Sequence, residues 1–281
     1  ISPVSVERDA DGIPVLTASN RKDLAFATGY VHGQDRFFQM DLIRRQAAGE
    51  LSALVGAAAI GVDKRNRFHR FRTRAQSVWD RATDQDKSLL EVYAAGVNAG
   101  LQSLSARPFE YFVLGSDPTP WQAQDSLLVM YAMYMQLNDA RASKEVRRGL
   151  AHNVLPEEVY RWMYPQGTPW DAAIMGEPRA VAPIPSARVF SLRDVTDDAE
   201  PAREQGRYPL RGSNNWAVSG ELTANGRAIV SNDMHLGLNN PNIYYQARLI
   251  VTGPDSLDVT GVTLPGGPFV VVEDTSVVET D

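Results

Sequence analysis

The sequence predicts a layered α+β fold, and two observations support that prediction. Apolar residues recur at helical spacing through much of the first 175 residues, whereas runs with a period of two dominate after residue 212. Between them, residues 176–212 are rich in proline and charge and poor in large apolar side chains. A helical segment followed by a sheet-rich segment is typical of layered α+β architecture.

Composition excludes several classes of function. The 281 residues are 43% hydrophobic and 22% charged, which is ordinary for a globular protein with a core. The formal net charge of −6 argues against nucleic acid as a partner, because phosphate binding needs a basic face. No apolar run approaches the roughly 20 residues that a membrane span needs. The absence of cysteine and the scattering of the four histidines disfavour a zinc-dependent amidase.

The first part of the chain divides into predicted elements. Residues 4–18 predict a short strand pair whose turn lies at residues 9–12. Helical spacing predicts helices over residues 21–55, 74–105 and 124–137, and we expect the polar stretch 138–148 to continue the last of them.

The second part predicts strands joined by tight turns. Two strand-like runs, 215–220 and 227–231, flank Asn225-Gly226, a strong hairpin signal because both positions tolerate positive φ. If this pair is a two-residue turn, Ser213 lies opposite Leu238 and His235 lies opposite Trp216. Further strands are predicted at 243–251, 257–264 and 269–272.

The junction at Gly212–Ser213 offers one route to catalysis, since no Gly-x-Ser-x-Gly elbow and no Gly-rich phosphate loop is present. Cleavage there would give Ser213 a hydroxyl and a free α-amine, whose unperturbed pKa is about 7.7–8. One residue could then supply both nucleophile and base. From spacing alone, however, a Gly-Ser pair before a strand is usually a loop, and residues 232–235 equally fit a turn beside a hydrogen-bonded histidine.

Two blocks of the sequence resemble the penicillin acylase family of N-terminal-nucleophile hydrolases, which includes penicillin, cephalosporin, aculeacin and acyl-homoserine-lactone acylases. The first block contains Arg8-Asp9, Gly12-Ile13-Pro14, Gly29-Tyr30-Val31-His32-Gly33-Gln34-Asp35-Arg36 and Gly49-Glu50-Leu51. The second contains Ser213-Asn214-Asn215-Trp216-Ala217-Val218, Thr223-Ala224-Asn225-Gly226 and Asn232-Asp233-Met234-His235-Leu236. The resemblance covers residues 4–272.

The resemblance implies a four-layer αββα fold and a chain that cuts itself. Residues 1–175 would be the helical first chain (alpha subunit), residues 176–212 a spacer removed during self-processing, and residues 213–281 the start of the second chain (beta subunit). The two chains would remain together as a heterodimer. Relatives are usually exported to the periplasm, so we expect a periplasmic protein from which a signal peptide has been removed, with secretion as the alternative.

The resemblance also assigns roles to single residues. Ser213 would attack the amide of an N-acylated small molecule, such as an acyl-homoserine lactone or a penicillin, and His235 would orient it. Leu236 and Met135 would line the acyl pocket, although a structural helix explains Met135 equally well. Glu145 would be a ligand of a structural calcium ion, or else an ordinary solvated charge. No cofactor is implied for the chemistry, and no nucleic acid or membrane partner.

The chain departs from the family pattern after Pro265-Gly266-Gly267-Pro268. The family has a Gly-x-Asn turn and a Trp-Gly strand there, whereas residues 273–281 read EDTSVVETD. The oxyanion-hole donors therefore cannot be assigned, and the loss of one such donor costs about 10²–10³ in rate. The alternative hypothesis is a catalytically incompetent fragment or an unprocessed precursor.

Overall fold

The computed structural model describes residues 2–138, 142–168, 170, 172–173, 175–177, 179–191, 193 and 212–274. It divides into two compact units, one formed by Ile1–Leu137 with Leu210–Asp281 and the other by Asn138–Pro209. Much of the predicted spacer, residues 194–211 above all, lies outside the described residues. The division into two chains and a spacer stays a prediction.

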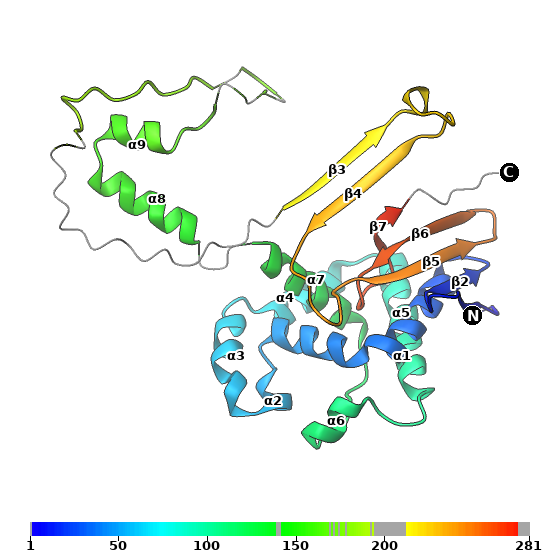
Figure 1. Ribbon diagram of the computed structural model, residues 1–281. Helices are drawn as coiled ribbons and strands as arrows, with labels where there is room; N and C mark the ends of the chain where they lie inside the picture. Colours follow the sequence, from blue (N-terminus) through cyan, green and yellow to red (C-terminus); the bar gives the residue numbers. More distant parts are fainter. Residues whose placement is uncertain are drawn as a thin grey trace. The chain divides into compact units, whose positions relative to one another are not determined.

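The larger unit contains a mixed five-stranded sheet in the order β1-β2-β5-β6-β7 (Figure 1). The strands are β1 (Ser5–Arg8), β2 (Pro14–Ala18), β5 (Tyr245–Val251), β6 (Leu257–Thr263) and β7 (Val270–Asp274). β2 and β5 are parallel, with Val15 opposite Arg248, and the other pairs are antiparallel. The predicted strand pair near the start and the three later strands are confirmed.

This unit also contains helices. They are α1 (Arg21–Ala48), α2 (Ser52–Val55), α3 (Ile60–Arg67), α4 (Phe71–Arg81), α5 (Asp84–Gln102), α6 (Phe109–Leu114) and α7 (Ala123–Leu137). The prediction of one helix over 74–105 is wrong: the Thr83 hydroxyl accepts a hydrogen bond from the Asp86 amide at 3.2 Å and thereby begins α5 as a separate helix. The predicted continuation over 138–148 is also wrong, since α7 ends at Leu137 and α8 begins at Ser143.

Glycines allow α1 and α5 to pack with almost no space between their backbones. A Cβ on Gly33 would lie 2.1 Å from the carbonyl oxygen of Val97, and one on Gly100 would lie 2.0 Å from that of Tyr30. Gly29 and Gly96 make equivalent approaches. Any larger side chain would separate the helices, so the glycines fix the position of α5 against α1.

One hydrophobic core lies where α1 covers the sheet. Alternate residues of β5 are buried, with Tyr245, Ala247, Leu249 and Val251 facing inward, as the pleat of a strand requires. They pack with residues that recur at helical spacing on α1, namely Leu24, Ala27 and Val31, and with Leu16 and Ala18 of β2.

A separate antiparallel hairpin carries the candidate nucleophile. β3 (Gly212–Val218) pairs with β4 (Ile229–His235), and Ser213 lies opposite Met234. The predicted register, with Ser213 opposite Leu238, is therefore wrong. Asn225-Gly226 does form a turn, with Gly226 at φ 71°, but it lies inside a ten-residue loop, 219–228.

That loop closes on itself through its own polar groups. The Thr223 hydroxyl lies 2.7 Å from the carbonyl oxygen of Arg227, and the Asn225 side chain accepts a hydrogen bond from the Arg227 amide at 3.1 Å. These local bonds replace the strand pairing that a two-residue turn would have given, which explains the shift in register.

The smaller unit contains α8 (Ser143–Val154) and α9 (Glu157–Met163). Pro156 precedes α9, and an ion pair of 2.7 Å joins Arg161 to Glu157 one turn away. In the described part of the chain, no helix is both long and apolar enough to cross a bilayer.

Candidate active site

The Gly212–Ser213 peptide lies at the start of β3, where both residues are exposed. The Ser213 hydroxyl donates a hydrogen bond of 2.6 Å to the carbonyl oxygen of Gly212. The hydroxyl oxygen is thus folded back toward the carbonyl group of the bond that self-cleavage would break. A Cβ on Gly212 would meet no atom within 4 Å, so space is open beside this peptide.

Strand pairing brings His235 beside the same peptide, but on the opposite face of the hairpin. His235 lies opposite Gly212, and Ser213 lies opposite Met234. Because side chains alternate along a strand, the side chains of Ser213 and His235 point to different faces. The two residues thus lie near each other in the hairpin, but in the described part of the chain no hydrogen bond joins their side chains. The orienting role of His235 stays a prediction.

His235 has partners on its own face of the hairpin. Its Nε2 lies 2.8 Å from Asp233 Oδ2 and 3.5 Å from Asn214 Nδ2. The His235 and Asp233 side chains are 46% and 51% exposed, so solvent screens their attraction. Asn215 and Asn232 share a hydrogen bond on the Ser213 face. Sequence reasoning did not single out Asp233 as a partner of His235, although the spacing of two residues along a strand would have suggested it.

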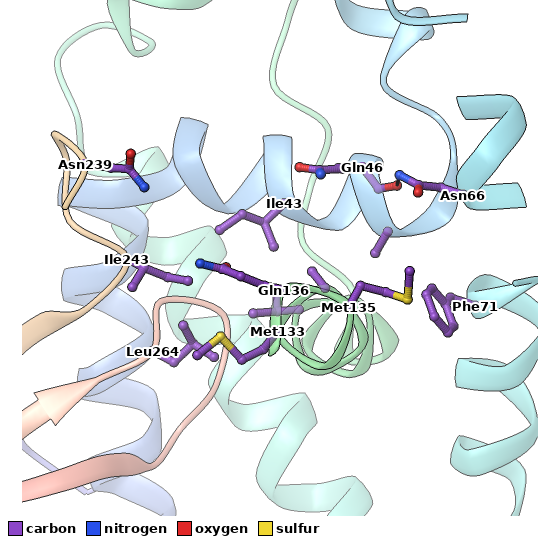
Figure 2. A pocket seen from close by; sticks show the side chains of 13 residues that line it. Ile43, Gln46, Asn66, Phe71, Met133, Met135, Gln136, Asn239, Ile243 and Leu264 are labelled. Carbon is purple, nitrogen blue, oxygen red and sulfur yellow. Dashed lines mark hydrogen bonds between the residues drawn. The ribbon is translucent and has the colours of Figure 1, made fainter. Parts of the chain in front are cut away.

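A cavity of about 490 Å³ lies between α1, α7 and two connections of the sheet (Figure 2). Nine of its thirteen lining residues are apolar and four carry carboxamides, although polar atoms form the larger part of the wall: Ile43, Gln46, Ala47, Asn66, Phe71, Val129, Ala132, Met133, Met135, Gln136, Asn239, Ile243 and Leu264. Figure 2 shows Met133 and Met135 projecting from α7, with Leu264 at one end and Phe71 at the other. Its volume lies in the range of small-molecule sites.

Met135 borders this cavity, whereas Leu236 is half-buried and is not part of the lining. The assignment of both residues to an acyl pocket stays a prediction. The chain nevertheless runs from His235 through Leu236 to Asn239, which does line the cavity. Val129, Ala132, Met133 and Gln136 recur at helical spacing, a signal that could have identified this face of α7 from the sequence. Leu264 belongs to a connection between strands, and no periodic signal marks it.

Glu145 is exposed on α8 in the smaller unit. Within the ranges that the structure describes, no three His, Asp or Glu side chains gather closely enough to hold a metal ion. Calcium takes six to eight oxygen ligands, and Glu145 contributes a single carboxylate. The role of Glu145 as a calcium ligand therefore stays a prediction.

The sequence model of the penicillin amidase family matches residues 3–272. The chain therefore belongs to that family. The penicillin acylase 2 proenzyme of Pseudomonas sp. (strain SE83) is 34% identical over 270 residues, which are 95% of this chain and 34% of that protein. The acyl-homoserine lactone acylase QuiP of Pseudomonas syringae pv. syringae (strain B728a) is 28% identical over 271 residues, 95% of this chain and 32% of that protein. The chain spans about a third of the length of these curated relatives.

A solved structure agrees on the fold. A thermostable penicillin G acylase from Alcaligenes faecalis matches with a TM-score of 0.52 and 23% identity, over 64% of this chain and 100% of that chain. The α+β prediction is confirmed: helices come first, the sheet comes mostly later, and the fold matches that of this penicillin G acylase.

Proposed function

We propose that this chain carries the nucleophile and part of the acyl-binding wall of a self-processing amidohydrolase. The single observation that carries the proposal is the 2.6 Å hydrogen bond from the Ser213 hydroxyl to the Gly212 carbonyl oxygen. It places the nucleophilic oxygen beside the carbonyl group that self-cleavage must attack. Membership of the penicillin amidase family, whose members named above are acylases, supports the same chemistry.

Self-processing would proceed by an N→O acyl shift. The Ser213 oxygen forms a bond to the carbonyl carbon of Gly212, the C–N bond breaks, and the nitrogen of Ser213 takes up a proton. Water then hydrolyses the ester, which leaves a carboxylate on Gly212 and a free amine and hydroxyl on Ser213. The exposed glycine before the serine leaves space for this rearrangement.

In turnover, the freed amine would accept the hydroxyl proton while the Ser213 oxygen attacks the substrate amide. The amine product leaves with a proton, and water releases the acid from the acyl-enzyme. The acyl group would occupy the cavity bordered by Met135 and Leu264, whose apolar side chains favour an aliphatic or aromatic acyl group. Acyl-homoserine lactones and penicillins are the two substrate classes proposed, because the relatives are named for both.

The proposal extends to the assembly. The segments before and after the spacer would remain associated as a heterodimer in the periplasm, with an N-acylated small molecule as the partner. Calcium, if bound, would be structural and would not take part in the chemistry.

The test is a serine substitution in the full-length protein. Ser213→Ala should abolish both self-cleavage and amide hydrolysis, because it removes the only atom that attacks in either step. Ser219→Ala is the matched control, since Ser219 follows the same strand and its hydroxyl only accepts a hydrogen bond from the Glu221 amide. Gel analysis reports cleavage, and mass spectrometry of products from acyl-homoserine lactones and penicillins reports hydrolysis and substrate class. A Ser213→Ala enzyme that still turned over would refute the proposal.

A further inference from the structure

His32 of α1 is completely buried and makes two hydrogen bonds to other elements. Its Nδ1 lies 2.8 Å from the hydroxyl of Tyr93 on α5, and its Nε2 lies 2.8 Å from the hydroxyl of Thr263 at the end of β6. All three side chains are inaccessible to solvent. The Tyr245 ring packs against the imidazole edge, with ring centroids 5.1 Å apart.

The neighbouring hydrogen bonds fix the direction of every proton in this network. Thr263 donates its hydroxyl proton to the carbonyl oxygen of Tyr245 at 2.9 Å, so its oxygen must accept from His32 Nε2–H. His32 Nδ1 is then unprotonated and accepts from Tyr93, whose oxygen in turn accepts from the Gly266 amide at 2.8 Å. The reversed direction would leave the Tyr93 proton without its acceptor, so a neutral imidazole in one tautomer satisfies every group.

The network holds both sides of a residue that lines the cavity. Thr263 and Gly266 flank Leu264, whose side chain lies at one end of the cavity (Figure 2). The backbone of Gly266 also packs directly against α7, because a Cβ there would lie 2.6 Å from a methyl carbon of Val129. Val129 itself lines the cavity. The β6–β7 turn is thus bonded to α1 and α5 on one side and pressed against α7 on the other.

We propose that His32 is a positioning residue that holds the β6–β7 turn so that Leu264 closes one end of the acyl cavity and limits acyl-chain length. The inference rests on the proposed function, which assigns the cavity to the acyl group. Every donor and acceptor of this network is paired in one arrangement. The network therefore fixes the position of the β6–β7 turn as well as stabilising the fold, because any displacement of the turn leaves a buried donor or acceptor unpaired.

The test compares the same chemical change, tyrosine to phenylalanine, at two positions of the full-length protein. Tyr93→Phe removes the hydroxyl that joins His32 to Gly266. Tyr111→Phe is the matched control: Tyr111 is equally buried, and its hydroxyl donates a single hydrogen bond to Asp41 at 2.7 Å, away from the cavity lining. Both variants lose a buried hydroxyl and a comparable amount of stability, so only the effect on the cavity should differ.

Two readouts are compared in each protein. The first is the ratio of kcat/KM for N-octanoyl and N-dodecanoyl homoserine lactone. The second is the ratio of dissociation constants of octanoic and dodecanoic acid, which are reaction products and bind without catalysis. Tyr93→Phe and Thr263→Val, which break the network at opposite ends, should each shift both ratios about tenfold, the size of effect that a methylene or two has in an apolar pocket. Tyr111→Phe should leave both ratios unchanged.

If Tyr93→Phe loses stability as Tyr111→Phe does and leaves both ratios unchanged, the network serves stability alone and the proposal is wrong. If the wild-type enzyme hydrolyses neither lactone but the acid-binding ratio still shifts, the proposed function fails for this substrate class while the positioning role stands. Failure of both acids to bind the processed wild-type enzyme would overturn the inference, because the cavity would then accept no acyl chain.

Discussion

The buried imidazole of His32 should make the free energy of unfolding depend on pH, and replacing His32 by glutamine should remove this dependence. Burial, with a smaller contribution from the positive charge of Arg36, lowers the pKa of His32 from about 6.5 to about 3. The other titratable groups that contact the ring are Tyr93 and Tyr245, whose pKa values burial raises above the ordinary value for a phenol. The native imidazole therefore stays neutral across the range from mildly acidic to neutral pH.

The sign and size of the effect follow from linkage. The unfolded chain binds a proton at His32 below about pH 6.5, whereas the native chain does not until about pH 3. The free energy of unfolding therefore falls as the pH drops through this window, with a limiting slope of about 1.4 kcal/mol per pH unit. Between about pH 7.5 and about pH 5, His32 should account for a loss of about 2 kcal/mol.

His32→Gln keeps a donor and an acceptor but does not titrate in this range. Urea unfolding of the wild-type protein and of His32→Gln, followed by tryptophan fluorescence at both pH values, measures the difference directly. The wild type should lose about 2 kcal/mol more than the variant on acidification, whatever their difference at neutral pH. Equal losses in the two proteins would refute the burial of a neutral imidazole.

Two further predictions concern the framework around the site. Gly33→Ala should destabilise the larger unit by about 1–3 kcal/mol in urea unfolding, because its Cβ would lie 2.1 Å from the Val97 carbonyl oxygen. The control, Gly61→Ala on α3, should be neutral or stabilising, because the nearest atom to its Cβ would be the flexible end of an arginine side chain at 3.7 Å. Equal effects of the two substitutions on stability would contradict the tight α1–α5 contact. Arg44→Ala should cost about 3 kcal/mol, because Asp41 and Asp125 lose the buried cation that they share and keep only Arg45 and Arg72 as charged partners. Arg248→Ala, at an exposed ion pair with Asp258, should cost about 1 kcal/mol or less, and similar costs for the two variants would show that the buried cluster is not desolvated.

Sequence periodicity predicted the elements that depend on local chemistry. The apolar residues of α1 recur at helical spacing, and those of β5 alternate, so both elements could be located from the sequence. The parallel pairing of Val15 with Arg248 could not, because it joins residues far apart in the chain. The glycine contacts between α1 and α5 could not be predicted either, because the sequence pattern does not indicate which helices pack against each other.

At the candidate site, the resemblance to the family identified the residues, and the structure gave their arrangement. Asn225-Gly226 correctly indicated a turn but gave the wrong register, because Thr223 and Asn225 bind the backbone of their own loop. That local competition decides whether Ser213 faces Leu238 or Met234, and periodicity carries no information on it. The role of His32 was also missed, because its partners come from α5 and β6.

The most direct test of the central claim is N-terminal sequencing of the purified, active full-length enzyme. The account predicts a second chain that begins Ser213-Asn214-Asn215, with the amine of Ser213 free. An active enzyme in which the peptide bond between Gly212 and Ser213 remains intact would contradict it.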